Sequence, residues 1–89
     1  MKKKQDSYIK ILNSLKDHIL ENYPSEFDNK SLPTNKSLVE LEVLDSYSVV
    51  QLVLFIEQNW KIQILDEEIT KEKMGSIDKM TNLILAKIS

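Results

Sequence analysis

DSYSVVQLVLFIEQN, residues 45–59, is the stretch that decides the fold. Its apolar positions cover most of a helical circumference. They leave only a narrow polar strip, formed by Ser48, Gln51 and Gln58. The apolar run at 52–56 would also suit a buried strand, but the segment is long for a strand and Asp45-Ser46 is a good helix start. We therefore predict a central helix over residues 45–59.

An amphipathic pattern precedes this segment. Apolar side chains recur at three- and four-residue steps, namely Tyr8, Leu12, Leu15, Ile19 and Tyr23. Asp6 or Ser7 is a suitable N-cap, and Pro24 pushes the residue before it out of the helical region. The pattern predicts a first helix over residues 6–21, preceded by a flexible terminus at 1–5.

Residues 22–45 form a long connection between these two helices. The segment contains two prolines and several Asn and Ser, without a period that suits a helix or a strand. A loop of this length is uncommon in a compact domain unless something holds it down. We expect its apolar side chains to pin it to the core: Leu32, Leu38, Leu41, Val43 and Leu44.

The rest of the chain predicts two more helices. Residues 60–65 alternate apolar and polar side chains, as a short extended stretch does. Asp66-Glu67-Glu68 places three carboxylates where a short helix over residues 66–74 would begin, and Gly75 would end it in a left-handed conformation. Ser76 is the expected cap of a last helix that runs to the terminus.

The predicted fold class is therefore all-α, a four-helix bundle in a single domain over residues 1–89. It has three long helices, a short third helix and a long crossover loop between helices one and two. The predicted core consists of Leu12, Leu15, Ile19, Leu52, Phe55, Ile56, Trp60, Ile77, Met80 and Ile84.

Length and composition exclude several classes of function. The chain has 89 residues, no Cys and one His, which excludes disulfides, thiol chemistry and a His/Cys metal cluster. Residues 37–78 carry nine acids against three Lys, so a basic protein surface is a better partner than nucleic acid. The apolar runs are too short to span a membrane, and polar residues interrupt any signal sequence, so we expect a cytoplasmic monomer.

Two weak candidates for chemistry are set aside. His18 stands among charged residues on an amphipathic helix, and no glycine elbow surrounds any serine, so we assign His18 to the solvated surface rather than to a hydrolytic triad. The acids at 66–68 suggest a cation site, but the spaced ligands and glycine of a calcium loop are missing.

Asp45-Ser46 is the remaining candidate. In isolation the pair is an ordinary helix cap. Here it stands at the start of the most hydrophobic helix, after a long loop, and Tyr47 follows it. A phosphate attached to a serine in this first turn would face backbone N–H groups and the positive end of the helix dipole.

These residues resemble the acyl carrier proteins and their peptidyl and D-alanyl relatives. Residues 43–57, VLDSYSVVQLVLFIE, look like the family's attachment motif, an Asp-Ser pair followed by a large apolar residue, and the helix after it. Trp60 falls where an aromatic residue is usual, Ile62 and Ile64 match the apolar pair after it, and residues 66–69 match the acidic opening of the third helix. The resemblance covers roughly residues 38–88.

The resemblance implies that Ser46 is esterified by 4′-phosphopantetheine, donated from coenzyme A by a phosphopantetheinyl transferase that uses magnesium. Asp45 would help to present the serine to that transferase. The thiol of the arm would carry an acyl or aminoacyl group as a thioester between a loading ligase and downstream acyl-processing enzymes. The carrier itself would catalyse nothing. The second helix would be the surface that partners read, through Tyr47, Val50, Gln51, Leu54 and Glu57.

Two features differ from the family pattern. Family members commonly have glycine two or three residues before the Asp-Ser pair, where this chain has Val43 and Glu42. The second helix carries Glu57 as its only acid after Asp45, unlike the strongly acidic helix of fatty acid synthesis carriers. We therefore expect a carrier of a dedicated biosynthetic pathway. The alternative is a small helical adaptor that binds a protein without a prosthetic group.

Overall fold

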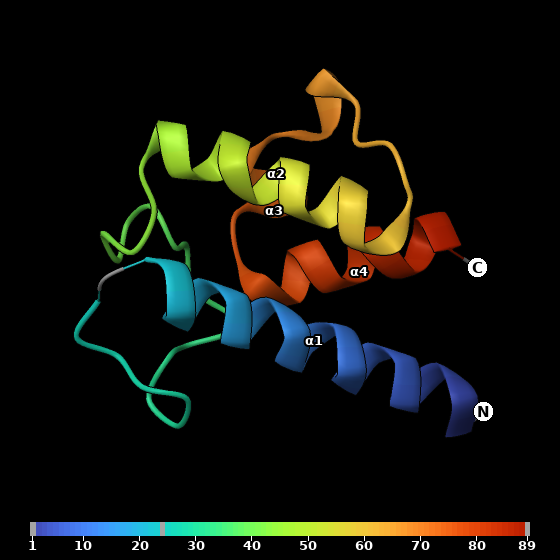
Figure 1. Cartoon of the computed structure of the whole chain (residues 1–89), viewed down its shortest axis with the longest axis horizontal. Helices are drawn as coiled ribbons and strands as arrows, with labels where there is room; N and C mark the ends of the chain where they lie inside the picture. Colours follow the sequence, from blue (N-terminus) through green and yellow to red (C-terminus); the bar gives the residue numbers. More distant parts are fainter. Residues whose placement is uncertain (1, 24, 89) are drawn as a thin grey trace.

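Four α-helices and one 3-10 turn are the regular elements of the part of the chain that the structure describes. The structure is a computed structural model that describes the backbone of residues 2–23 and 25–88 and the side-chain burial of residues 7–23 and 25–88. Figure 1 shows the three long helices side by side, with α1 running opposite to α2 and α4. The elements are α1 (Lys2–Asn22), α2 (Ser46–Trp60), η1 (Asp66–Glu68), α3 (Lys71–Met74) and α4 (Ile77–Ile88). The described residues contain no strand, which confirms the all-α fold.

The first helix starts earlier than predicted. It begins at Lys2, so the predicted start at Asp6 or Ser7 was wrong. Lys and Gln are good helix formers and no Gly or Pro precedes Asp6, so nothing in this stretch stops the helix. Its end at Asn22 agrees with the prediction. Tyr8 ties α1 to the fourth helix, because its hydroxyl donates to Oδ1 of Asp78 at 2.9 Å.

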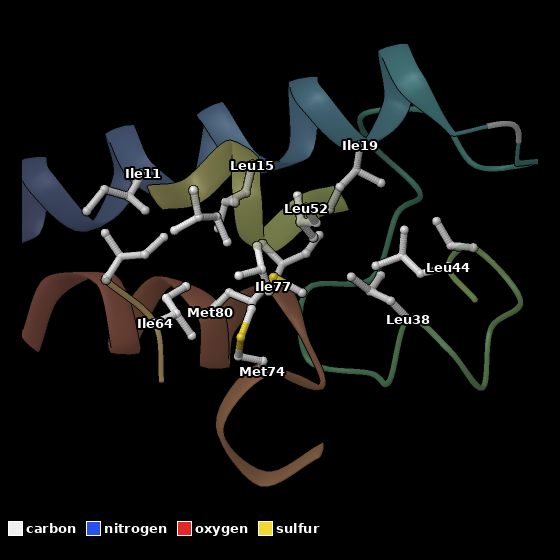
Figure 2. Close-up of a cluster of buried hydrophobic side chains, with 14 of the residues drawn as sticks. Ile11, Leu15, Ile19, Leu38, Leu44, Leu52, Ile64, Met74, Ile77 and Met80 are labelled. Carbon is white, nitrogen blue, oxygen red and sulfur yellow. The ribbon is translucent and has the colours of Figure 1, made fainter. Parts of the chain in front are cut away.

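The core lies where α1, α2 and α4 face one another. Figure 2 shows Ile11, Leu15 and Ile19 of α1 directed toward Ile77 and Met80 of α4. Seven residues of the predicted core are buried: Leu15, Ile19, Leu52, Ile56, Ile77, Met80 and Ile84. The other three are only partly buried against it: Leu12, Phe55 and Trp60. Phe55 instead contacts two other rings, stacked on His18 and edge-on to Trp60.

The long crossover loop is held to the rest of the domain by both packing and hydrogen bonds. Leu38 is fully buried, and its backbone N–H donates to the carbonyl of Gly75 at 3.0 Å. The N–H of Asp78 donates to the carbonyl of Thr34 at 2.9 Å. Four of the five predicted pinning residues are buried and Leu41 is partly buried, so the prediction is confirmed; the four are Leu32, Leu38, Val43 and Leu44.

The predicted third helix is split into two pieces. Asp66–Glu68 forms a 3-10 turn, after which Thr70 is extended and its hydroxyl caps a new, single-turn helix by accepting the N–H of Lys73. An N-cap residue has a non-helical backbone, so a cap at Thr70 ends the turn that precedes it. The carboxylate of Glu68 accepts the N–H of Leu65 and pairs with Lys87 of α4 at 2.8 Å.

Gly75 does not have the left-handed conformation that we predicted. Its φ of −69° and ψ of −24° are right-handed. Glycine is needed at this position for a different reason. A Cβ built there would lie 2.3 Å from the backbone oxygen of Lys71, which is too close. The expected cap of the last helix is confirmed, because Oγ of Ser76 accepts the N–H of Lys79 at 3.2 Å. Among the described residues, no helix is long and apolar enough to cross a membrane.

His18 is less exposed than predicted. Its ring stacks on Phe55 of α2, with the ring centroids 3.6 Å apart and the planes 9° from parallel. Tyr23 meets the His18 ring edge-on at 6.0 Å. Desolvation in this contact lowers the pKa of His18, against a smaller opposing effect of the Glu21 charge. His18 is therefore part of the contact between α1 and α2.

The lowered pKa of His18 predicts a pH dependence of stability. The unfolded chain takes up the proton near the ordinary pKa of about 6.5, at higher pH than the folded chain does. The contribution of neutral His18 to the stability of the fold is therefore present above that pH. It is lost as the pH falls through the lower pKa that His18 has in the folded chain. Thermal unfolding between pH 8 and pH 5 should show a falling melting temperature. His18→Phe keeps an aromatic ring in the contact with Phe55 but removes the titrating group. An equally steep fall of the melting temperature in that variant would contradict the assignment of this pH dependence to His18.

Candidate functional site at the start of helix α2

Asp45 and Ser46 mark the first turn of α2. Asp45 is the N-cap, and its Oδ1 accepts the backbone N–H of Ser48 at 2.8 Å. This hydrogen bond lowers the pKa of the Asp45 carboxyl group. Ser46 is the first residue of the helix and is exposed. Because Asp45 serves as the cap, the hydroxyl of Ser46 is not needed to hold the helix start and is open to an incoming reagent.

An apolar groove of about 440 Å³ has Ser46 on its rim. Val49 and Val50 of α2 form one wall next to the serine. The other walls come from the crossover loop and from the α3 region, namely Leu38, Val39, Leu44, Ile69, Thr70 and Met74. The ammonium group of Lys71 pairs with the carboxylate of Glu40 and so joins the loop to α3 beside the groove. A flexible arm attached to Ser46 would have an apolar surface to lie on.

Three exposed apolar side chains follow the serine along α2. Tyr47, Val50 and Leu54 are 70%, 54% and 53% exposed. Their three- and four-residue steps place them on one face of the helix, and we call these three residues the apolar stripe. Gln51 is also exposed on α2. Four of the five predicted partner-contact residues therefore lie open on the helix that begins at Ser46.

Glu57, the fifth predicted partner-contact residue, is only partly exposed and is engaged by the backbone. Its Oε2 accepts the backbone N–H of Ile64 at 2.9 Å, and the side chain is partly buried. The carboxylate thus ties the end of α2 to the segment that leads into η1. Ile64 itself is buried in the core. Glu57 is the only acid within α2, so this partly buried carboxylate is the only negative charge that the helix itself carries after Asp45.

Glu42 has a left-handed backbone, with a φ of 62°. It stands three residues before Asp45, at one of the two positions where this sequence differs from the pattern described above. The loop therefore makes a left-handed turn at this position without a glycine. Non-glycine residues in this region are strained by about 1–2 kcal/mol, because Cβ approaches the following carbonyl oxygen. Glu42 also lines a second hollow, of about 470 Å³, together with Asp45, Ser46 and Ser48.

Glu42→Gly is expected to stabilise the protein by about 0.5–1 kcal/mol, the relief of this strain less the extra freedom that glycine gives the unfolded chain. The measurement is the free energy of unfolding in urea. Glu42→Ala is the matched control, since it removes the same side chain but leaves Cβ in the left-handed turn. An equal gain in both variants would show that the side chain, rather than the backbone, is responsible.

The groove is the part of the site that sequence reasoning missed. Its residues come from three separate segments, the crossover loop, the start of α2 and residues 69–75. Two of its apolar residues, Val39 and Ile69, lie 30 positions apart in the sequence, and no pattern along the chain brings them together. Among the described residues, no three His, Cys, Asp or Glu side chains gather where they could hold a metal ion.

Comparison with known proteins gives a structural neighbour. No family model matches the sequence, and no curated protein matches it. A chain in a solved structure described as "Crystal structure of FAD-dependent dehydrogenase" is similar, with a TM-score of 0.60 and 29% sequence identity. The match covers 81% of this chain and 94% of that chain, so the matched chain is somewhat shorter than 89 residues.

Proposed function

We propose that the chain is an acyl carrier protein that holds its cargo as a thioester on a 4′-phosphopantetheine arm attached to Ser46. The observation that carries the proposal is an exposed serine directly after a capping aspartate, on the rim of an apolar groove. A helix cap alone would explain Asp45, but it requires neither the exposed Ser46 nor the groove beside it.

Attachment of the arm requires no catalysis by the chain itself. The Oγ of Ser46 forms a bond to the phosphorus next to pantetheine in coenzyme A, and the pyrophosphate bond to the adenosine part breaks. A separate transferase with its magnesium supplies the catalysis. This chain contributes an accessible hydroxyl and the start of α2, whose N–H groups and dipole favour the attached phosphate. The groove would then accommodate part of the arm or of a small cargo.

The main alternative is a small helical adaptor without a prosthetic group. An adaptor would use the same exposed face of α2, so the apolar stripe does not distinguish the two functions. Covalent modification distinguishes the two functions, because an adaptor without a prosthetic group does not require a serine that accepts phosphopantetheine.

The structural neighbour suggests one of the carrier's partners. The similar chain comes from a structure described as an FAD-dependent dehydrogenase. By analogy, we propose that a flavin-dependent dehydrogenase is among the enzymes that act on the cargo of this carrier.

The absence of cysteine makes the proposal simple to test. The chain contains no thiol of its own, so any thiol on the purified protein reports the arm. After incubation with coenzyme A and a broad-specificity phosphopantetheinyl transferase, followed by removal of coenzyme A, Ellman's reagent should detect one thiol per chain. Omission of the transferase should leave none. Zero thiols in the complete reaction, while a known carrier is modified alongside, would reject the proposal.

A further inference from the structure

We propose that the groove beside Ser46 leads to a small basic hollow, and that this hollow binds the free carboxylate of a dicarboxylic cargo. The inference rests on the proposed carrier function and deepens it, because it names the class of acyl group on the arm. Such a cargo would use one carboxyl group for the thioester and keep the other as an anion. Three observations carry it: the position of the hollow, the charges around it, and the hydroxyl groups in its wall.

The hollow adjoins the groove. It has a volume of about 300 Å³ and lies between the crossover loop, α3 and the start of α4. Ser46 lines the groove but not the hollow, whereas Lys36 and Lys79 line the hollow but not the groove. Four residues line both: Ser37, Glu40, Lys71 and Gly75. A flexible chain that starts at Ser46 and follows the groove therefore meets the hollow at these shared residues.

Backbone hydrogen bonds fix the two sides of the hollow relative to each other. The N–H of Leu38 donates to the carbonyl of Gly75 at 3.0 Å, and the N–H of Asp78 donates to the carbonyl of Thr34 at 2.9 Å. Both bonds join the crossover loop to the segment between the end of α3 and the first turn of α4. The hollow is therefore a feature of the folded backbone and not a gap between mobile side chains.

The charge around the hollow is positive. Of the described residues that line it, three are lysines and one is an acid, Glu40. Glu40 pairs with Lys71, so the net positive charge comes from Lys36 of the crossover loop and Lys79 of α4. This is a local exception, because residues 37–78 carry nine acids against three Lys. The hollow attracts an anionic group and repels an ammonium group.

Two hydroxyl groups in the wall can donate hydrogen bonds to a carboxylate. Oγ of Ser37 accepts the N–H of Glu40 at 3.3 Å, and Oγ of Ser76 accepts the N–H of Lys79 at 3.2 Å. Each serine thus uses a lone pair and keeps its hydroxyl proton to donate. Ser76 is only 4% exposed, so water competes little for its proton. Nζ of Lys79 lies 3.4 Å from the backbone oxygen of Lys71 and keeps further N–H groups for an anion.

The groove and the hollow together discriminate between classes of cargo. A dicarboxylic acyl group places its apolar carbon atoms along the groove and its charge among the lysines. A simple fatty acyl group has no anion for the hollow, and an aminoacyl group brings an ammonium group to a basic site. Of the acyl and aminoacyl cargoes that the carrier function allows, the dicarboxylic acyl group is the one that suits both parts of the site.

Backbone amide chemical shifts test where the cargo ends. The transferase loads the isotope-labelled chain from succinyl-, butyryl- or β-alanyl-coenzyme A, whose acyl groups end in a carboxylate, a methyl group and an ammonium group. Mass spectrometry confirms each loaded form. We expect the amides of Lys36, Ser37, Ser76 and Lys79 to shift in the succinyl form relative to the butyryl form. The β-alanyl form should show no such shifts.

Two sets of substitutions change the charge of the hollow in opposite directions. Lys36→Gln/Lys79→Gln removes the lysines that Glu40 does not neutralise, so the succinyl-dependent shifts of Ser37 and Ser76 should fall by about half or more. Glu40→Gln removes the opposing carboxylate, so the same shifts should increase. All three side chains are exposed, and the fold should tolerate both changes.

Lys10→Gln/Lys61→Gln is the matched control. It removes the same charge from exposed positions on α1 and after α2 that line neither the groove nor the hollow. The succinyl-dependent shifts should persist in it. Equal losses in the two lysine pairs would show that the overall charge of the chain, and not the hollow, attracts the cargo, and would overturn the proposal.

The remaining outcomes separate this inference from the carrier function. If the chain is loaded but the succinyl and butyryl forms have the same shifts around the hollow, the inference fails and the carrier function stands. Shifts that inorganic phosphate causes there in the unmodified chain, without any succinyl-dependent shifts, would assign the hollow to a free anion and also overturn it. A chain that takes up no arm, while a known carrier does, would reject the carrier function and this inference with it.

Discussion

Ile56→Ala is expected to lower the free energy of unfolding by about 2–5 kcal/mol. Ile56 lies on α2 and is fully buried in the core shared with α1 and α4. Its removal deletes buried methyl and methylene groups and leaves a cavity that the neighbouring helices fill only partly. Total stability of a small domain is about 5–15 kcal/mol, so the loss is a large share of it. Urea unfolding followed by circular dichroism measures the change.

Leu54→Ala is the matched control for this core prediction. Leu54 is on the same helix, two residues earlier, and is 53% exposed. Its truncation removes a similar side chain without opening a cavity, so stability should change by no more than about 0.5–1 kcal/mol. If the two variants lost equal stability, the orientation of α2 described here would be wrong.

Ser46→Ala should abolish the thiol that the transferase introduces while leaving the fold unchanged. Asp45 is the residue that caps α2, and alanine is the best helix former, so loss of the first-turn hydroxyl has little effect on stability. Ser48→Ala is the control, because Ser48 is in the same turn and its backbone N–H still donates to Asp45. It should carry one thiol per chain, like the wild type. Thiol on the Ser46→Ala variant would exclude Ser46 as the attachment site.

The sequence predicts the long helices well because their signals are local. Apolar residues at helical steps and capping residues such as Asp45 and Ser76 depend on a few neighbours along the chain, and both caps are found where we expected them. The start of α1 was wrong because Asp6 is a plausible cap but nothing before it breaks a helix. The split of the third helix depends on Thr70, whose capping role competes with continuation of the helix.

The features that sequence reasoning missed depend on contacts that helical periodicity does not show. Gly75 is fixed by the nearby Lys71 carbonyl, which periodicity does not reveal. Glu57 was assigned to the partner surface from its helical position, but its acceptor role depends on the backbone of Ile64 after the helix has ended. His18 was assigned to solvent because its own helix is charged around it, whereas Phe55 of α2 covers its ring.

Peptide mapping by mass spectrometry after transferase treatment tests the central claim most directly. The account predicts a single 4′-phosphopantetheine on the wild-type chain, located by fragmentation on Ser46, and no modified peptide without coenzyme A. A modification on Ser48 or on any other residue would contradict the assignment of the site. No modification at all, under conditions that convert a known carrier completely, would contradict the carrier function.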